Sequence, residues 1–443
     1  MKAKHYFDPD PGIRNNLIKL NKEKNFVALE KDLDKQLIEF PNSSFLLNLK
    51  GSCLANQNKF EESILSFNLA LESAKNPEVI LNNIGVTQIK LNQFEDSVLS
   101  FNKAIESKVD YVEPFFNRGT ALRKLGRTED AIESYQAALE INPNYLGAHK
   151  MLGKIAFQQE DYTKAAKHYK RELTLNETSV SYCDLGRAYT ELGIADSARM
   201  CFYKSIDLDN NFSDSYLYLA KLEGADGNIN KSFQAAARAC ELDKNNMEYQ
   251  YVYNVILVQM DRGSEAVLSL KKVVDKWPWH PGAHYNLGKA LIQSGKKLQG
   301  EKFLDKSKAA IADQNKIKHL ENIIRDLQND PYAYKALAIV LQNVGRHKEA
   351  LHTYKIALYL DPANYEIWNE VAKLYLQQND TVSALNTYNI IVDKNPNLAE
   401  VWLDMGIIYD LSNQKNKAEE AWSTALQLEP NNVSIINHLN KLK

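Results

Sequence analysis

The chain has 443 residues, and its charges nearly balance, with 54 Lys and Arg against 56 Asp and Glu. Only 18 glycines and 12 prolines are present, too few for the many turns of an all-β protein, so the composition predicts a mostly helical fold. The 44% hydrophobic content argues against global disorder, and the lack of a basic excess argues against a general nucleic-acid-binding protein.

The N-terminus and the cysteines bear on the compartment. The first residues, MKAKHYFDPDPGIRNN, lack the apolar segment of a signal peptide, and no apolar stretch approaches the roughly 18 residues of a membrane span. The four cysteines, Cys53, Cys183, Cys201 and Cys240, form no C-x-x-C motif, which favours reduced thiols. These features predict a soluble cytoplasmic protein. If the true start lies upstream of Met1, a periplasmic or envelope-associated protein is the alternative.

A pattern of about 34 residues recurs along most of the chain. Each copy contains a small residue, a second small residue twelve positions later, and, in most copies, a large residue such as Phe67, Tyr135 or Trp422 four positions after that. The first small positions are Gly51, Gly85, Gly119, Gly153, Gly186, Ala220, Gly288, Ala338, Ala372 and Gly406, with Asn254 in the remaining slot. The pattern predicts two antiparallel helices per repeat, which approach each other closely at the small residues.

The repeat resembles the tetratricopeptide repeat. The copies that carry the resemblance best are NRGTALRKLGRTEDAIESYQAALEINPN (117–144) and LAIVLQNVGRHKEALHTYKIALYLDPAN (337–364). The resemblance implies an all-α fold, a right-handed superhelical solenoid of stacked antiparallel helix pairs whose first helices line a concave groove. Such families bind peptides or partner domains in that groove, and generally do no chemistry and need no cofactor.

The register divides the chain into five segments. A degenerate capping repeat is expected within 1–43, eight repeats at 44–314, an inserted helix at 315–330, three repeats at 331–432 and a C-terminal cap at 433–443. In the cap, the residues expected to cover the last helix pair are Val433, Ile436 and Leu439.

The insertion reads NKIKHLENIIRDLQND, and its apolar residues Ile317, Leu320, Ile324 and Leu327 follow a helical spacing. It is expected either to lengthen the preceding helix or to add one helix, and to break the superhelix between 44–314 and 331–432. A locally repacked joint and a hinge or docking helix are the two interpretations of this segment.

The chain contains no G-x-G-x-x-G, Walker A, H-E-x-x-H or G-x-S-x-G motif, so no catalytic residues are expected. His280 and His284 are four residues apart, but Pro281 and Gly282 lie between them, so a packed histidine at 284 is favoured over a metal ligand. Trp277 and Trp279 flank a proline in a loop between repeats. Either they fill the space between helix pairs, or they form an exposed contact site.

The resemblance places certain first-helix positions on the concave side of the groove. Basic residues at these positions are Lys150, Lys154, Arg187, Lys221 and Lys289, and amides are Asn83 and Asn117. Cations and amides suit an acidic side chain, a terminal carboxylate or a peptide backbone. The predicted ligand is therefore a protein or peptide of acidic character, bound without nucleic acid or a membrane span.

Three functions fit this interpretation. The first is a non-catalytic interaction scaffold or adaptor. The second is a substrate-recruiting partner of a glycosyltransferase-type enzyme, since grooves lined by asparagine occur in O-GlcNAc transferases. The third is an exported or envelope assembly factor. Beyond Asn83 and Asn117 the asparagines here do not run through consecutive repeats, and the three-repeat carboxylate clamp of cochaperones is not reproduced either.

Overall fold

The computed structural model describes residues 8–327 and 329–442, which form α-helices joined by short turns, with no strand in those ranges. The helices of the first seven repeats are α1 (Pro11–Lys22), α2 (Phe26–Glu39), α3 (Ser44–Asn56), α4 (Phe60–Glu72), α5 (Glu78–Lys90), α6 (Phe94–Ser107), α7 (Val112–Lys124), α8 (Thr128–Ile141), α9 (Ala148–Gln158), α10 (Tyr162–Leu175), α11 (Ser179–Glu191), α12 (Ala195–Leu208), α13 (Ser213–Ala225) and α14 (Ile229–Leu242). Those that follow are α15 (Met247–Gln259), α16 (Gly263–Lys276), α17 (Pro281–Gln293), α18 (Lys297–Asp326), α19 (Pro331–Asn343), α20 (His347–Leu360), α21 (Tyr365–Gln377), α22 (Thr381–Lys394), α23 (Ala399–Leu411), α24 (Lys415–Leu428) and α25 (Val433–Leu442).

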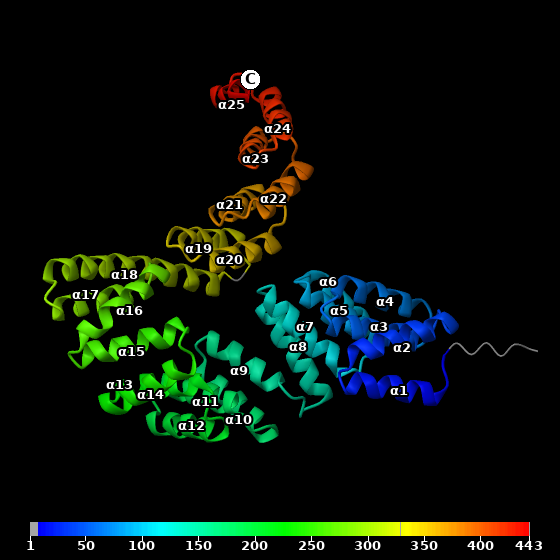
Figure 1. The fold of residues 1–443 in the computed structure, drawn as a ribbon, viewed down its shortest axis with the longest axis horizontal. Helices are drawn as coiled ribbons and strands as arrows, with labels where there is room; N and C mark the ends of the chain where they lie inside the picture. Colours follow the sequence, from blue (N-terminus) through cyan, green and yellow to red (C-terminus); the bar gives the residue numbers. More distant parts are fainter. Residues whose placement is uncertain (1–7, 328, 443) are drawn as a thin grey trace, which may run out of the picture. The chain divides into compact units, whose positions relative to one another are not determined.

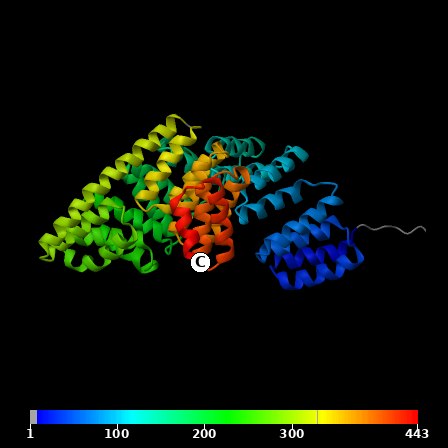
Figure 2. The same ribbon diagram turned by 90° about the horizontal axis from the view of Figure 1, so that it is seen from above.

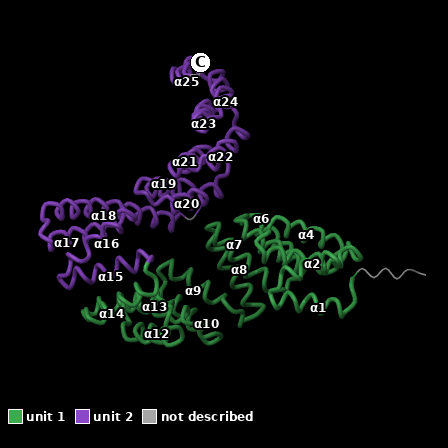
Figure 3. Tube along the Cα trace, viewed as in Figure 1, with its two compact units in different colours: residues 1–244 green, residues 245–443 purple. Residues whose placement is uncertain are grey.

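Each odd-numbered helix up to α23 packs against the even-numbered helix that follows it, and each pair packs on the next within residues 1–244 and within residues 245–443 (Figure 1). We call the two members of a pair the A helix and the B helix. The chain falls into two compact units, an N-terminal unit of residues 1–244 and a C-terminal unit of residues 245–443 (Figure 3). The insertion lies inside the C-terminal unit, where α18 packs directly on α19, and a break of the superhelix at this point stays a prediction.

In six repeats the first small residue is a glycine that packs against an aromatic ring of the same repeat. A Cβ atom added to Gly51 would lie 2.5 Å from the ring of Phe67, and one added to Gly186 would lie 2.6 Å from the ring of Phe202. The same ring-on-glycine contact recurs at Gly85, Gly119, Gly153 and Gly406. At these six glycines the ring lies so close to the backbone that a Cβ would overlap it, whereas alanine occupies the same position opposite a tyrosine at Ala338 and Ala372.

The second small position lies on the facing side of the B helix. At two of the serines in this position the hydroxyl donates a hydrogen bond to the carbonyl of the first small residue: Ser63 Oγ lies 2.7 Å from Gly51 O, and Ser232 Oγ 2.7 Å from Ala220 O. The Ser97 hydroxyl donates instead to Phe94 O. Where it is alanine, as at Ala131, the side chain is fully buried. The sequence pattern therefore marks the line along which the A and B helices touch.

The turn between A and B helices has one residue with a positive φ in every repeat. Glycine occupies it at Gly126, Gly193, Gly227, Gly295 and Gly345, and asparagine at Asn58, Asn92, Asn379 and Asn413. Lys24, Glu160 and Asp261 complete the series. These positions fall at the same place in all twelve repeats, including the degenerate first one. Because left-handed backbone is unfavourable for most residues, glycine and asparagine dominate there.

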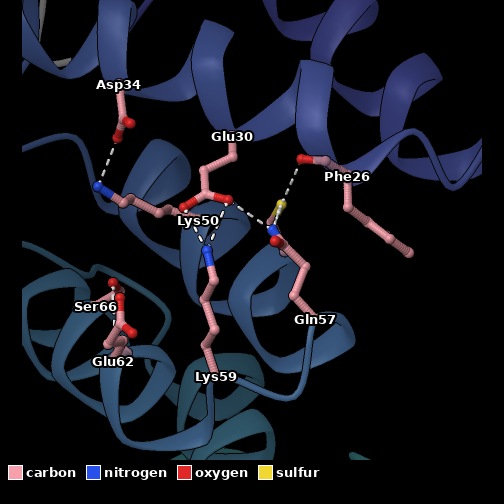
Figure 4. A network of polar contacts seen from close by, with 9 residues as sticks. Phe26, Glu30, Asp34, Lys50, Gln57, Lys59, Glu62 and Ser66 are labelled. Atoms are coloured by element: carbon pink, nitrogen blue, oxygen red, sulfur yellow. Dashed lines mark hydrogen bonds and ion pairs between the residues drawn. The ribbon is translucent and has the colours of Figure 1, made fainter.

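The first repeat is joined to the second by polar contacts as well as by its apolar core. Leu17, Leu29 and Leu33 of α1 and α2 are buried against Leu46 and Cys53 of α3. Beside this core, Glu30 of α2 accepts hydrogen bonds from Gln57 Nε2 at 2.8 Å and from Lys59 Nζ at 3.1 Å (Figure 4). The hydrogen bond from Gln57 holds the pKa of the Glu30 carboxyl below its usual value, with Lys59 adding to the effect.

The insertion lengthens the preceding helix, the first of the two expected arrangements, so that α18 runs for 30 residues without a break (Figure 2). Ile317 is buried against α19 and α20, and Leu320 and Ile324 pack beside it. Leu327 does not share this face, because α18 ends at Asp326 and the Leu327 side chain is exposed.

The C-terminal helix α25 covers the last pair with a different face from the one expected. Ile435 is fully buried beside Ala418 and Trp422, Leu439 packs at its edge, and the ring of His438 stacks on Trp422 at 4.8 Å. Val433 and Ile436 are exposed, so the expectation that they cover the pair was wrong. The buried stripe begins two residues into the helix, and an imidazole supplies part of it.

Candidate partner-binding site

The A helices carry the candidate site. In four places the A helices of neighbouring repeats contact one another directly: α3 with α5, α5 with α7, α11 with α13 and α15 with α17. Among the described helices, no two B helices of neighbouring repeats contact each other to that extent. The A helices therefore form the closely spaced side of each stack, and side chains from successive A helices meet there.

Three of the predicted cations surround a buried carboxylate that the sequence interpretation did not single out. Asp184 on α11 is 8% exposed. Its Oδ1 lies 3.6 Å from Arg187 Nη1, and its Oδ2 lies 3.9 Å from Lys154 Nζ on α9. Burial raises the pKa of the Asp184 carboxyl, and the positive charges of Lys154, Arg187 and Lys150 oppose that rise. The i, i+3 spacing of Asp184 and Arg187 is the sequence feature that marks this pair.

The carboxylate is not fully satisfied by its neighbours. Both ion pairs are longer than a hydrogen bond, and Asp184 Oδ2 is buried without a hydrogen-bond partner in the described structure. The cluster thus holds more positive than negative charge, and it also has an unused acceptor at its centre.

Aromatic rings fix the position of Arg187. Its guanidinium carbon lies 4.8 Å from the ring centre of Phe157 on α9 and 4.6 Å from that of Tyr218 on α13. Lys221 Nζ lies 5.2 Å from the same Tyr218 ring. Contacts of this kind attract a cation to the face of the ring. Arg187 is therefore held between neighbouring repeats, and Lys221 adjoins it on α13.

The two predicted amides lie elsewhere on the A helices and bind to other amides. Asn83 Nδ2 donates to Asn48 Oδ1 at 3.1 Å, and Asn117 Nδ2 donates to Asn82 Oδ1 at 2.9 Å. Each bond joins one A helix to the next. Asn83 and Asn117 therefore connect α3, α5 and α7 and are not part of the charged cluster.

Lys289 lies on α17 in the C-terminal unit, where its Nζ is 5.2 Å from the ring centre of Tyr285. Lys150, Lys154, Arg187 and Lys221 all lie on α9, α11 and α13 of the N-terminal unit. The structure thus brings four of the seven predicted residues together.

The histidines and tryptophans around Pro278 are used in packing. His284 is buried, with Nε2 2.8 Å from the carbonyl of Pro278, and His280 Nδ1 accepts the Ala283 N–H at the start of α17. Trp277 packs edge-on against Tyr251. Trp279 lies near Gly345 and lines a cavity of about 290 Å³ with residues of α18 and of the turn after α19.

The cysteines do not form a reactive group. None of the four is in a disulfide, and burial raises the pKa of Cys183 to about 12 and those of Cys201 and Cys240 to about 11. Over the described residues, no three His, Cys, Asp or Glu side chains gather in a way that would hold a metal ion. No helix in the described ranges is both long and apolar enough to cross a membrane.

Two sequence profiles of the tetratricopeptide repeat match the chain. One matches residues 83–145, 116–180 and 335–399, and the other residues 46–77 and 180–212. Together they span about half of the chain. No curated protein sequence matches it.

Solved structures similar to the chain include two that are described as tetratricopeptide repeat proteins. The C-terminal part of a tetratricopeptide repeat-containing protein from Cytophaga hutchinsonii is 19% identical, with a TM-score of 0.44, and the match covers 54% of this chain and 98% of that one. A tetratricopeptide repeat protein from Parabacteroides merdae is 16% identical, with a TM-score of 0.43 and coverages of 56% and 98%. A chain of the APC/C hetero-tetramer Cut9-Hcn1 is 12% identical, with a TM-score of 0.33 and coverages of 97% and 95%.

The profile matches, the stacked helix pairs and the recurring turn agree on one architecture, which extends beyond the matched ranges. This chain belongs to the tetratricopeptide repeat family.

Proposed function

We propose that the protein is a non-catalytic scaffold that binds an acidic segment of a partner protein on the A helices α9, α11 and α13. The observation that carries the proposal is the excess of cations there: Lys150, Lys154 and Arg187 outnumber the two nearby carboxylates, Asp184 and Asp214, and Lys221 adjoins Arg187 at the ring of Tyr218. Membership of a family of protein-interaction repeats supports the general function.

The structure suggests how one acidic side chain would be recognised. Arg187 is already held between Phe157 and Tyr218, so little side-chain freedom is lost when it binds a carboxylate. Lys154 and Lys221 lie on the helices at either side.

The test is selection from a library of random decapeptides displayed on phage. Wild-type protein is expected to enrich sequences rich in Asp and Glu, and the binding of synthetic copies should weaken as salt rises, because exposed charges are screened. The variant Lys154→Glu, Arg187→Glu, Lys221→Glu is expected to lose this enrichment.

The matched control reverses three exposed lysines on B helices, Lys103, Lys204 and Lys271. It makes the same change in net charge and is expected to keep the enrichment. Circular dichroism should show both variants folded. Selection of peptides without acidic residues, or equal loss in the control, would reject the proposed site.

A further inference from the structure

A second cluster of positive charge lies on a B helix. Lys164, Lys167, Lys170 and Arg171 are exposed on α10, and His149 and His168 lie half-buried beside them on α9 and α10. Together with Thr174 these side chains line a hollow of about 570 Å³. The cluster is separate from the cations around Asp184 and plays no part in the function proposed above.

The basic side chains of this hollow are not neutralised by the protein. In the described structure no carboxylate forms an ion pair with these cations, which are Lys164, Lys167, Lys170 and Arg171. Arg171 donates hydrogen bonds to Asn144 Oδ1 and Thr174 Oγ1. Lys170 lies over the ring of Tyr189 on α11. The two adjacent carboxylates, Asp161 and Glu172, accept hydrogen bonds from backbone N–H groups. Asp161 Oδ1 caps α10 by accepting the Lys164 N–H at 2.9 Å. Glu172 accepts the N–H groups of Gly147 and Lys150 at the start of α9.

The uncompensated positive charge affects the protonation of the two histidines, His149 and His168. Their Nδ1 atoms are 3.1 Å apart, which makes a hydrogen bond only if at least one ring is neutral. Burial lowers the pKa of His168 to about 4, and the positive charges of His149, Lys164 and Lys167 add to the effect while Asp161 opposes it. Burial and Arg171 lower the pKa of His149, against Glu172. The hollow is thus a place where further positive charge is disfavoured.

We propose that this face of α10 binds a compact ligand carrying several phosphate groups. From Lys164 to Arg171 the helix rises about 10 Å, a length that suits two or three linked phosphates better than a long polymer. Each linked phosphate brings about one to two negative charges and several acceptor oxygens, which Lys, Arg and His N–H groups match. Bound anions would offset the mutual repulsion of the cations and favour a charged imidazole.

The probe is inorganic tripolyphosphate, added to the full chain with ¹³C-labelled histidine. His149→Gln and His168→Gln variants assign the two ring signals. Tripolyphosphate is expected to shift both signals and to raise the pH at which they titrate. By reciprocal linkage, protonation of these rings should tighten the binding of tripolyphosphate. A glutamate peptide of equal charge and a single-stranded oligonucleotide are tested in the same way.

The variant Lys164→Gln, Lys167→Gln, Arg171→Gln is expected to bind tripolyphosphate about tenfold more weakly, since each exposed pair contributes up to about 1 kcal/mol and tenfold equals about 1.4 kcal/mol. Its matched control is Lys103→Gln, Lys204→Gln, Lys271→Gln, which should bind as the wild type does. Three outcomes overturn the proposal: no shift of either histidine up to about 10 mM tripolyphosphate, equal weakening in the control, or equal or tighter binding of the peptide or the oligonucleotide.

Discussion

The A helices α3–α7 and α9–α13 present equivalent positions of the repeat, yet they use their polar groups differently. On α3, α5 and α7 the amides of Asn48, Asn83, Asn82 and Asn117 pair with one another. On α9, α11 and α13 the cations gather around Asp184, whose Oδ2 has no hydrogen-bond partner in the described structure. The position in the repeat determines where a side chain lies on the stack. The neighbouring side chains determine whether that side chain can bind a ligand.

The largest expected effects on stability come from the glycine–ring contacts between A and B helices, which both regions share. Gly85→Ala and Gly186→Ala should each lower the free energy of unfolding by roughly 1–3 kcal/mol, because the new Cβ would lie 2.5–2.6 Å from Phe101 or Phe202. Urea denaturation measures both values, and they should agree with each other. A large difference between them would mean that the two regions differ in packing as well as in surface chemistry.

A turn glycine provides the control for this prediction. Gly193 has a φ of +72° and no atom within 4 Å of an added Cβ, so Gly193→Ala should cost about 1–2 kcal/mol through backbone conformation alone. Phe202→Leu should partly relieve the effect of Gly186→Ala and should leave that of Gly193→Ala unchanged.

Arg187→Ala should destabilise the protein by about 2 kcal/mol, and Asn117→Ala by about 1 kcal/mol. Arg187 loses contacts with two rings and leaves Asp184 less compensated, whereas Asn117 loses one amide hydrogen bond. Denaturation at low salt and at 1 M salt separates the causes. The Arg187→Ala effect should shrink at high salt, because it includes a charge interaction, and the Asn117→Ala effect should stay constant. Equal salt dependence would contradict the distinction between the two regions.

The smallest effect is a pH dependence confined to the charged region. The raised pKa of Asp184 means that the folded state holds this proton more tightly than the unfolded state does. The resulting stabilisation is fully present below the ordinary Asp value of about 3.9 and is lost as pH rises through the folded value. Asp184→Asn removes this dependence, so its stability relative to the wild type should increase as the pH rises from 3 to 7.

Thermal denaturation across this pH range makes the comparison, with Asn82→Ala as a control that carries no titrating group. The difference between Asn82→Ala and the wild type should stay flat. A flat difference for Asp184→Asn as well would show that Asp184 does not titrate differently in the folded state.

The helical repeat could be predicted from sequence because it depends on contacts at fixed spacing along the chain. A glycine and an aromatic residue 16 positions later, as in Gly51 and Phe67, lie in one helix pair, so the register alone places them in contact. The insertion was recognised from the same register, and its apolar spacing correctly indicated Ile317, Leu320 and Ile324 as packing residues.

The tertiary structure alone decided which polar groups face each other. Asp184 meets Lys154 from the preceding repeat, and His168 meets His149 across a helix pair, and neither partnership follows from the 34-residue pattern. The same holds at the C-terminus, where Ile435 and His438, and not Ile436, meet Trp422. Repeat spacing fixes the backbone because hydrophobic packing requires only that large and small residues alternate at regular positions. Charge and hydrogen bonding depend on distances of a few ångströms between particular atoms, and only the folded chain sets those distances.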